Sequence, residues 1–335
     1  MNSEQKKIVV IGGGTGSATV LSGLKNYDVM LTALMAMTDD GGSNGILRRE
    51  FNLLPTAGIW QAMTVLSTQE PLLIELFRYR YHEGEGISGM TFGNLIFAAL
   101  SDILGSQDRA ISEIARMLAV KGEVIPISHD MAQLVAVYED GSVVIGEHNI
   151  DQPSHDGTLR IKRTMTKPNA KLNPEARGAI LQADVVILGP GDFYTNTVAD
   201  LVIEGVVEAL LECDALVVFI VNILTKLGET YGYSVSDFLK DLDIYLPLSR
   251  INALIINSDT DISLDDLEGV SVVNDDIRND ALPENIKIIR DALVSKEKVE
   301  GQRGDPIKRN KIRHDSAKIG NLLWRLLNEK TSSLD

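Results

Sequence analysis

The sequence predicts an α/β fold: a doubly wound, Rossmann-like, mainly parallel sheet with an inserted helical segment and a β-hairpin region. Three observations lead to this prediction. Short β-branched runs alternate with helical stretches at both ends of the chain. Several of those runs stop at glycine or polar residues, as strands buried on both faces commonly do. A long block of helical pattern separates the two alternating regions.

The first half of the chain contributes two strands and the helical block. Residues 7–11 (KIVVI) are β-branched and run directly into glycines, which predicts a buried parallel strand. A helical stretch with one apolar side follows, and then a second apolar run over residues 29–37. From residue 59 to about residue 119 the pattern is helical throughout, long enough for a helical layer or an inserted subdomain.

The second half begins with a hairpin and then resumes the alternation. Asp140-Gly141 supplies the positive φ of a tight turn, so residues 132–139 and 142–145 are expected to pair. Residues 158–163 are a candidate third strand beside them. Further along, the pattern predicts helices near 174–182, 198–212 and 234–242, strands at 185–188, 216–221 and 253–256, and a final amphipathic helix at 316–327.

The length of 335 residues allows one large domain or two ordinary ones. We expect a single Rossmann-like nucleotide-binding domain over residues 1–330, followed by a polar tail at 331–335. Within the domain, the helical insertion should occupy about 59–120 and the hairpin region about 124–163.

Composition excludes several classes of protein. The chain has 32 basic and 47 acidic residues, a formal charge of −15, which argues against general nucleic-acid binding because that needs a positive face. Cys213 is the only cysteine, so intrachain disulfides and multi-cysteine zinc sites are excluded. The N-terminal residues are polar, and the longest apolar run, residues 215–221, is too short for a membrane helix. A cytoplasmic protein without membrane insertion is expected.

Candidate site residues lie where the predicted strands end. In open α/β sheets, ligands bind outside the carboxyl ends of the strands, near the point where the strand order reverses. Four strand ends carry glycine or polar residues, at 12–16, 38–42, 189–195 and 222. The fold rule brings all four to one edge of the sheet.

The first strand end, Gly12-Gly13-Gly14-Thr15-Gly16, has the composition of a phosphate-binding loop. Glycines let the backbone approach an anion, and the helix that follows offers free N–H groups. It is not a Walker loop, and Ser17 stands where a dinucleotide fingerprint has its third small residue. Two readings remain open: a nucleotide or phosphate loop, and a strand-to-helix turn without a ligand.

The other strand ends add polar groups. The neighbouring carboxylates Asp39 and Asp40 can hold a metal ion, act as a base or accept hydrogen bonds, and an aspartate can equally cap a helix. Tyr194 offers a ring and a hydroxyl after a glycine-rich turn, and Asn222 is a polar residue at the end of a buried strand. The basic run at residues 308–313 either lies in solvent or supplies Arg313 to phosphates. No metal-binding histidine spacing and no nucleophile elbow occurs, so a triad hydrolase is not expected.

Six segments together resemble a known family. They are IVVIGGGTGSATVLSGLK, TDDGGSNGILRREF, FGNLIFAALSDI, ILGPGDFYT, NILTKLGETYGYSVSDF and KIRHD, spread from about residue 8 to residue 327. They resemble the YvcK family of gluconeogenesis factors and, more distantly, 2-phospho-L-lactate transferase, CofD. The segment GETYGYSVSDF is closer to the YvcK pattern than to that of CofD.

The resemblance implies a nucleotide site at the carboxyl edge of the sheet. By matching motifs, its residues would be Gly13, Gly14, Thr15, Gly16, Asp39, Asp40, Asn94, Gly189, Gly191, Tyr194, Asn222 and Arg313. YvcK-like proteins are thought to bind UDP-sugars such as UDP-N-acetylglucosamine. They support cell-wall morphogenesis and growth on gluconeogenic carbon, without an established reaction. CofD-like proteins transfer a phospholactyl group from a nucleotide-activated donor to a deazaflavin, with a divalent metal.

Three positions depart from the family pattern. Gly58 and Trp60 stand where the family has an aspartate and an arginine, and Asp192 stands where serine is usual. Each lost charge removes charge-assisted hydrogen bonds worth about 1.5–3 kcal/mol. Trp60 can either stack on a ligand or pack in the interior, and packing is favoured.

The leading expectation is a regulatory protein that binds a nucleotide sugar such as UDP-N-acetylglucosamine, with no catalytic residue, metal or cofactor. The alternative is a CofD-like transferase in which Asp39 and Asp40 bind Mg²⁺. The expected partner is the small-molecule ligand, and not nucleic acid. A homo-oligomer is possible, and protein partners stay open.

Overall fold

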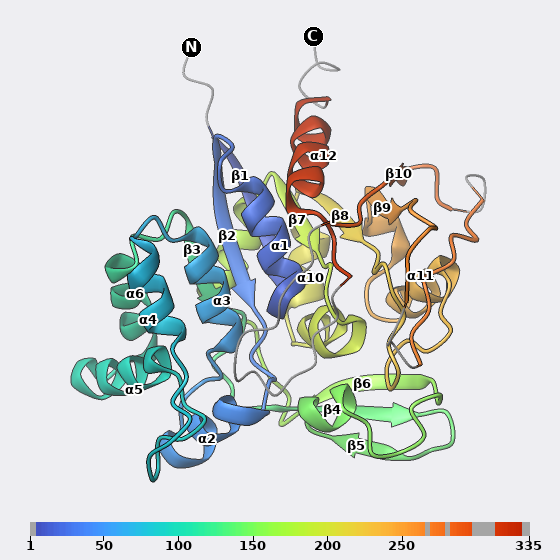
Figure 1. Cartoon of the computed structure of the whole chain (residues 1–335). Coiled ribbons are helices and arrows are strands. Elements are labelled where there is room, and N and C mark those ends of the chain that lie inside the picture. Colours follow the sequence, from blue (N-terminus) through green and yellow to red (C-terminus); the bar gives the residue numbers. More distant parts are fainter. Residues whose placement is uncertain (1–4, 265–268, 279–281, 297–311, 330–335) are drawn as a thin grey trace.

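The computed structural model describes residues 5–264, 269–278, 282–296 and 312–329. Its centre is a parallel sheet in the order β10-β9-β8-β7-β1-β2-β3 (Figure 1). These strands are β1 (Lys6–Gly12), β2 (Val29–Met35), β3 (Glu123–Pro126), β7 (Val185–Leu188), β8 (Leu216–Ile220), β9 (Ala253–Asn257) and β10 (Lys287–Asp291). The order runs outward in both directions from β1 and β7, so the strand order reverses between those two. The doubly wound prediction is confirmed, and the expected ligand crevice lies between the ends of β1 and β7.

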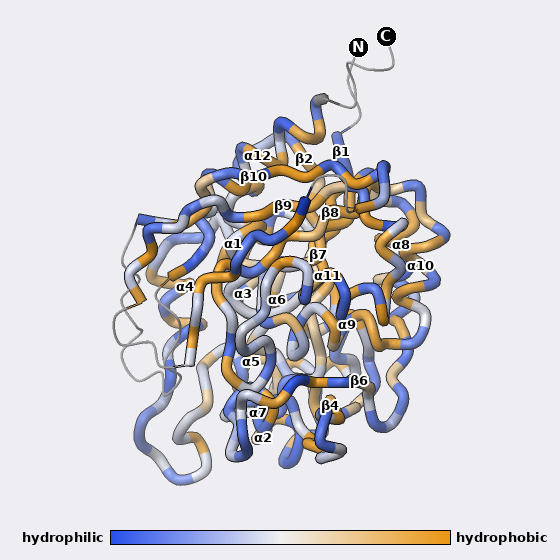
Figure 2. Tube along the Cα trace, turned by 90° about the vertical axis from the view of Figure 1, so that its right-hand side faces the viewer, coloured by the Kyte–Doolittle hydropathy of each residue, from blue (hydrophilic) through white to orange (hydrophobic). Residues whose placement is uncertain are grey.

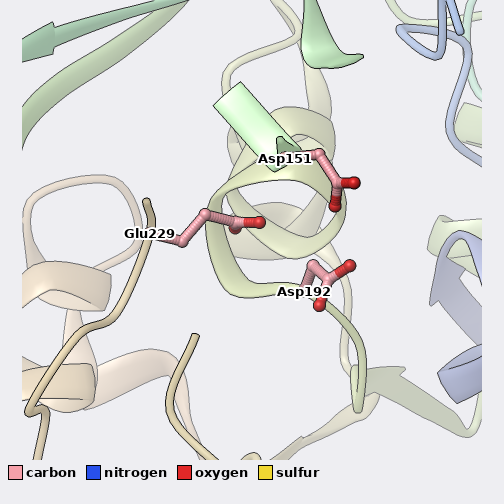
Figure 3. Close-up of side chains that lie close together, drawn as sticks. All are labelled: Asp151, Asp192 and Glu229. Carbon is pink, nitrogen blue, oxygen red and sulfur yellow. The ribbon is translucent and has the colours of Figure 1, made fainter. Parts of the chain in front are cut away.

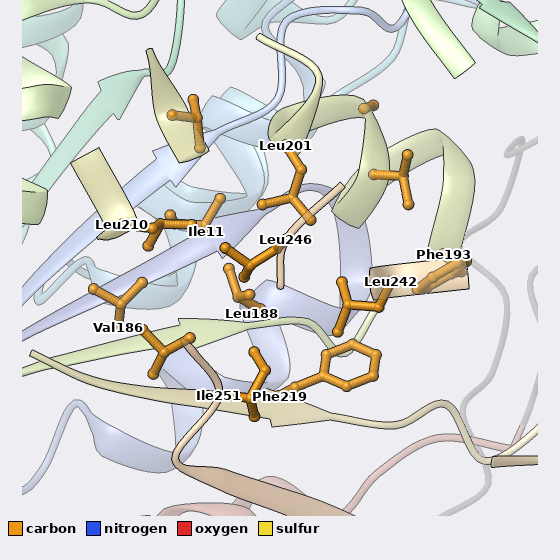
Figure 4. Packing of buried hydrophobic residues seen from close by; sticks show 14 of the residues in the cluster. Ile11, Val186, Leu188, Phe193, Leu201, Leu210, Phe219, Leu242, Leu246 and Ile251 are labelled. Carbon is orange, nitrogen blue, oxygen red and sulfur yellow. The ribbon is translucent and has the colours of Figure 1, made fainter. Parts of the chain in front are cut away.

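The sheet is buried on both faces. Side chains alternate along β1, so Ile8 and Val10 enter one hydrophobic core while Val9 and Ile11 enter the other. The strands β7 and β8 are apolar along their length, which explains their continuous β-branched sequence (Figure 2). Figure 4 shows the core on the Val9 side, where Leu188 and Phe219 pack beneath the helices.

Two helical layers cover the sheet. On the Ile8 side lie α1 (Gly14–Leu24), α3 (Ala57–Leu66) and α12 (Ser316–Glu329). On the Val9 side lie α8 (Pro174–Gln182), α10 (Val206–Glu212) and α11 (Val235–Asp243). The helices α1 and α12 approach so closely that a Cβ on Gly23 would lie 2.2 Å from the Ser316 carbonyl oxygen. The last described helix of the chain therefore packs directly on the first.

The helical block is an outer layer beyond α3. It contains α4 (Pro71–Arg78), α5 (Phe92–Leu104) and α6 (Gln107–Met117). The expectation of helix throughout 59–119 was wrong for residues 79–91, a loop closed by an antiparallel bridge between Arg80 and Thr91. Glycines at 84, 86 and 89 take positive φ there, which ends helical winding. A further helix, α2 (Gly42–Phe51), was not predicted, because its first turn is rich in glycine.

The predicted hairpin is confirmed as a small antiparallel sheet in the order β5-β4-β6. It consists of β4 (Gln133–Tyr138), β5 (Val143–Ile145) and β6 (Ile161–Lys167), with α7 (Glu147–Asp151) after β5. The expected hairpin region began at 124, but residues 123–126 are β3 and pair with β2 at the edge of the main sheet. A short run such as EVIP does not reveal which sheet it will join.

Two other predictions need correction. The helix expected at 198–212 is three pieces: the π-helix η1 (Phe193–Val198), α9 (Ala199–Leu201) and α10. The break before α10 is at Gly205, whose φ of 99° is outside the helical range. The half-buried edge strand β10 and the 3₁₀ turn η2 (Leu248–Arg250) were not predicted.

Within the described ranges, no helix is long and apolar enough to cross a bilayer. The single-domain division stays a prediction, and the tail at 331–335 lies outside the described residues.

Candidate functional site

The glycine loop lies at the carboxyl end of β1 and opens α1. Gly12 and Gly14 have φ of 151° and 62°, which favour glycine. Two other glycines are required by packing, because a Cβ on Gly13 would lie 2.2 Å from Asn196 Oδ1, and one on Gly16 would lie 1.9 Å from the Pro190 carbonyl oxygen. The absence of side chains at Gly13 and Gly16 therefore lets the loop after β7 pack directly on the glycine loop. The sequence analysis did not predict this packing role.

The loop after β7 already holds an anion from its own chain. The Glu229 carboxylate accepts hydrogen bonds from the backbone N–H of Tyr194 at 2.8 Å and of Thr195 at 3.1 Å. It also accepts one from the Thr195 hydroxyl at 3.0 Å. The Asn222 side chain donates to the Gly191 carbonyl at 2.7 Å. The N–H groups of Tyr194 and Thr195, at a strand end predicted to join the nucleotide site, are thus satisfied by Glu229.

Tyr194 points into the interior. It is 1% exposed, and its hydroxyl donates to Asp241 Oδ2 at 2.6 Å and lies 3.2 Å from the Tyr233 hydroxyl. Burial raises the pKa of Tyr194, and Tyr233 and Asp241 raise it further. The ligand contact predicted for this residue stays a prediction, and the structure gives its ring and hydroxyl a place in the core.

Asp39 and Asp40 accept hydrogen bonds from the starts of two different helices, α2 and α7. Asp39 accepts hydrogen bonds from the Gly41 N–H at 3.0 Å and from Asn44 Nδ2 at 2.7 Å, at the start of α2. Asp40 accepts one from the His148 N–H at 3.0 Å, at the start of α7. Burial raises the pKa of the Asp39 carboxyl despite these donors. Neither aspartate is the N-cap of α2, which is Gly41, but Asp40 accepts a hydrogen bond from a backbone N–H in the first turn of α7.

Trp60 packs in the interior, as favoured from the sequence. It is 8% exposed and meets the Phe97 ring edge-on at a centroid distance of 5.8 Å. Its Nε1–H donates to Asn94 Oδ1 at 2.8 Å, and the Thr56 hydroxyl donates to the same oxygen at 3.0 Å. The other amide atom, Asn94 Nδ2, is buried and has no hydrogen-bond partner among the described residues. Asn94 is thus occupied on its acceptor side by the tryptophan that departs from the family pattern.

A lysine lies among three carboxylates at this edge. Asp151, Asp192 and Glu229 each place an oxygen within 4.8 Å of the others and point toward one another (Figure 3). The Lys226 ammonium lies 2.8 Å from Asp192 Oδ2 and 3.1 Å from Glu229 Oε1, and it also bonds Asp151 Oδ1. Asp192, which replaces the serine usual in the family, therefore has its negative charge paired with Lys226.

Lys226 and Asp151 stabilise each other's charge, whereas burial raises the pKa of Glu229 despite the nearby lysine. Burial alone would lower the pKa of Lys226, but the surrounding carboxylates raise it well above its usual value. Burial likewise opposes ionisation of Asp151, and Lys226 overcomes this to give a lowered pKa. Nearby Glu147 has a pKa raised well above its usual value by burial and by the charges of Asp39 and Asp151.

A divalent metal does not fit among Asp151, Asp192 and Glu229 as they stand, because the Lys226 ammonium lies between them. In the described part of the chain, the only group of three metal-type ligands is the one that Lys226 fills. The carboxylates of Asp39 and Asp40 bond different helices and do not join a third carboxylate in such a group. Sequence reasoning missed Lys226, Asp151 and Glu229, because Asp151 comes from α7, 75 residues from Lys226.

A cavity of about 260 Å³ lies between α1, α3 and the segment before α12. Side chains with hydroxyl, amide, guanidinium and imidazole groups line it: Thr15, Thr19, Ser22, Gln61, Ser295, Arg313, His314 and Ser316. Burial lowers the pKa of His314 to about 4, although a hydrogen bond with the Val221 backbone opposes this. The imidazole is therefore neutral at physiological pH, and Arg313 is the cationic side chain of this cavity.

The structure places most of the predicted residues in several different settings. Thr15 and Arg313, from opposite ends of the chain, line the cavity. Gly13, Gly16, Gly191 and Asn222 form the contact between the loops after β1 and β7. Asp39 and Asp40 bond α2 and α7, and Asn94 and Tyr194 are interior. Part of the basic run, residues 308–311, lies outside the described residues.

Comparison with known proteins gives a consistent result. Residues 8–294 match the family model described as 2-phospho-L-lactate transferase CofD. The chain is 34% identical over 332 residues to the Bacillus subtilis protein named gluconeogenesis factor, covering 97% of this chain and 99% of that protein. It is 40% identical over 263 residues to the gluconeogenesis factor of Listeria innocua, covering 78% and 80%.

A crystal structure also resembles this fold over nearly its whole length. It is a member of the upf0052 family from Bacillus halodurans, with a TM-score of 0.84 and 31% sequence identity. The match covers 96% of this chain and 100% of that one. The α/β architecture described above is thus shared with an experimental structure.

Proposed function

The chain belongs to the CofD family and to the family of the gluconeogenesis factors, and on that premise we propose that it is a regulatory protein that binds a nucleotide sugar. The ligand class we propose is UDP-N-acetylglucosamine or a close analogue. Its binding would support cell-wall morphogenesis and growth on gluconeogenic carbon sources. No catalytic step is assigned to any residue.

The observation that carries this proposal is that Thr15 and Arg313 line one cavity beside the start of α1. A guanidinium favours an anion, and the hydroxyls along one side of α1 can donate to phosphate or sugar oxygens. The volume of about 260 Å³ is below the roughly 300–1,000 Å³ of pockets that enclose a drug-sized ligand. We therefore expect this cavity to take only one part of a nucleotide sugar.

Binding should not need a divalent metal. Arg313 supplies positive charge on the cavity side. On the other side of the glycine loop, Lys226 rather than a metal ion neutralises the carboxylates. We therefore expect the same affinity with and without Mg²⁺.

The test is a thermal melt with UDP-N-acetylglucosamine in the presence of a chelator. At 100 times the dissociation constant, the ligand should stabilise the protein by about 2.7 kcal/mol. For a chain of 335 residues this is about 4 °C in Tm. Thr15→Val and Arg313→Ala should abolish the shift. Arg116→Ala, which removes a side chain that is 77% exposed on α6, should leave it intact.

Absence of any shift in the wild-type protein at millimolar ligand would count against the proposal. A shift that survives in both Thr15→Val and Arg313→Ala would place the ligand elsewhere. Either result can be read without an activity assay.

The second candidate is a CofD-like transferase that moves a phospholactyl-type group, favoured by the family match over residues 8–294. It needs Asp39 and Asp40 to bind Mg²⁺, and both carboxylates already accept hydrogen bonds from backbone N–H groups. Magnesium-dependent consumption of a nucleotide-activated donor would support it. Metal-independent binding with no product would leave the regulatory proposal as the better account.

A further inference from the structure

The π-helix η1 places a polar side chain, Asn196, in the crevice between β1 and β7. This side chain lies against the glycine loop, since a Cβ added to Gly13 would lie 2.2 Å from Asn196 Oδ1, and one added to Gly14 would lie 3.9 Å from it. It also contacts the loop after β7, where a Cβ on Gly191 would lie 3.6 Å from Asn196 Cβ. The strand order reverses at this point, and open α/β sheets bind their ligands there.

The amide group of Asn196 makes no hydrogen bond to any described residue. Only the backbone N–H of Asn196 is used, which donates to the Asp192 carbonyl at 3.0 Å. The side chain is half-buried, so water satisfies its amide in the free protein, and a ligand can replace that water. The nearby Asn222 differs, because its amide donates to the Gly191 carbonyl at 2.7 Å.

The groups around Asn196 favour hydroxyls over phosphate. Asn196 lies one turn after Asp192, and it directly follows Thr195, whose hydroxyl donates to Glu229. Around Lys226, carboxyl groups outnumber the ammonium three to one. A phosphate placed there would meet acceptors and negative charge. A hydroxyl can donate to a carboxylate or an amide oxygen, and it can accept from an amide N–H.

The positive charge lies on the other side of the glycine loop. Arg313 and Thr15 line the cavity of about 260 Å³, which takes only one part of a nucleotide sugar. Thr15 directly follows Gly14, beside which the Asn196 amide lies, and consecutive Cα atoms are about 3.8 Å apart. One ligand can therefore reach both the cavity and Asn196.

We propose that the Asn196 amide hydrogen-bonds a sugar hydroxyl of the ligand. The crevice between β1 and β7 then holds a sugar, and the phosphates lie toward Arg313. This inference rests on the proposed function and specifies how the ligand is oriented at that site. A ribose and a hexose both carry suitable hydroxyls, so the experiment separates these two sources.

The experiment is isothermal titration of the wild type and Asn196→Ala with UDP-N-acetylglucosamine, UDP and pyrophosphate, in the presence of a chelator. Loss of one hydrogen bond should weaken the binding of UDP-N-acetylglucosamine about three- to tenfold. Pyrophosphate, which carries no sugar, should bind both proteins equally. An equal loss for UDP assigns the contact to the ribose, and a loss confined to UDP-N-acetylglucosamine assigns it to the second sugar.

Two asparagines serve as matched controls. Asn196→Ala should leave Tm unchanged, because the amide bonds no described residue. Asn222→Ala removes the hydrogen bond to the Gly191 carbonyl and should lower Tm by about 1–2 °C. Asn26→Ala alters an exposed residue between α1 and β2, at the opposite edge of the sheet, and should bind all three ligands as the wild type does.

Three results overturn this inference while leaving the proposed function in place. The first is Asn196→Ala binding UDP-N-acetylglucosamine as tightly as the wild type. The second is an equal loss of pyrophosphate binding, which would assign the amide to a phosphate. The third is a fall in Tm as large as that of Asn222→Ala, which would give the amide a role in the fold. A wild-type protein that binds neither UDP nor UDP-N-acetylglucosamine overturns both proposals.

Discussion

Replacing Lys226 by methionine should reveal how the carboxylate cluster is held together. The change keeps a long side chain and removes the ammonium that lies 2.8 Å from Asp192 and 3.1 Å from Glu229. Removing one partner of a buried ion pair typically costs about 3–5 kcal/mol, because the remaining charge is left uncompensated. The Lys226 side chain is 26% exposed, so we expect the lower part of that range.

The corresponding change in Tm follows from the size of the protein. At about 2.1 cal/mol/K per residue, a chain of 335 residues has an unfolding entropy of about 0.7 kcal/mol/K. A loss of about 3 kcal/mol therefore lowers Tm by about 4 °C. Thermal melts at pH 7.5 followed by circular dichroism would measure it.

The matched control is Lys6→Met. Lys6 pairs with Asp184 at 3.3 Å, but the two side chains are 43% and 39% exposed. Exposed pairs contribute about 0–1 kcal/mol, so Tm should fall by no more than about 1 °C. If Lys226→Met melts like Lys6→Met, the cluster does not depend on the lysine and the reasoning fails.

The pH dependence gives a second readout. Lys226 lowers the pKa of Asp151, and a carboxyl with a lowered pKa adds stability above its unfolded pKa, about 3.9. That stability is lost as pH falls through the folded-state pKa. The difference in Tm between wild type and Lys226→Met should therefore shrink below about pH 4. In the variant, millimolar Mg²⁺ or Ca²⁺ should recover part of the lost stability, since carboxylate oxygens are their preferred ligands.

Three further changes test other parts of the structure. Asp200 is 1% exposed, neither carboxylate oxygen has a partner among the described residues, and burial raises its pKa well above the usual value. A raised pKa gives stability that is present below the unfolded pKa and lost as pH rises, at about 1.4 kcal/mol per unit, until the folded form ionises. Asp200→Asn should remove this slope of about 2 °C per pH unit in melts above pH 4, whereas the exposed Asp214→Asn should keep it. Trp60→Phe keeps one aromatic ring but removes the hydrogen bond to Asn94 and part of a buried indole, so urea unfolding should show a loss of more than about 1 kcal/mol; no loss would mean that both the bond and the packing are replaced. Gly16→Ala places a Cβ 1.9 Å from the Pro190 carbonyl oxygen and should lower Tm by several degrees, while Gly178→Ala, with open space around it, should not; equal Tm values would contradict the close loop contact.

The sequence determined the architecture because strand and helix periodicity are local properties. The β-branched runs at β1, β7, β8 and β9 were predicted as strands, and their abrupt ends correctly marked the carboxyl edge of the sheet. Periodicity failed where local signals are weak. β3 has four residues and β10 is half-buried, and the glycines that begin α2 hide a helix that tertiary contacts stabilise.

The four strand ends that carry predicted site residues share one edge of the sheet, and what each residue touches was decided by partners distant in the chain. Gly13 and Gly16 looked like places for an anion to approach, whereas their missing Cβ atoms make room for Asn196 and the Pro190 carbonyl. No local pattern could show that Glu229 satisfies the N–H groups of Tyr194 and Thr195.

The stretch from Thr38 to Gln61 also shows which features the sequence predicts and which depend on tertiary contacts. Its sequence shows that an aspartate and an arginine of the family pattern are replaced by Gly58 and Trp60. Only the tertiary structure decides that Trp60 turns inward to Asn94. Likewise, Asp192 reads from the sequence as an extra negative charge, and the fold supplies Lys226 to pair with it. Local sequence determines which backbone elements form, while the neighbours of a side chain depend on how those elements pack.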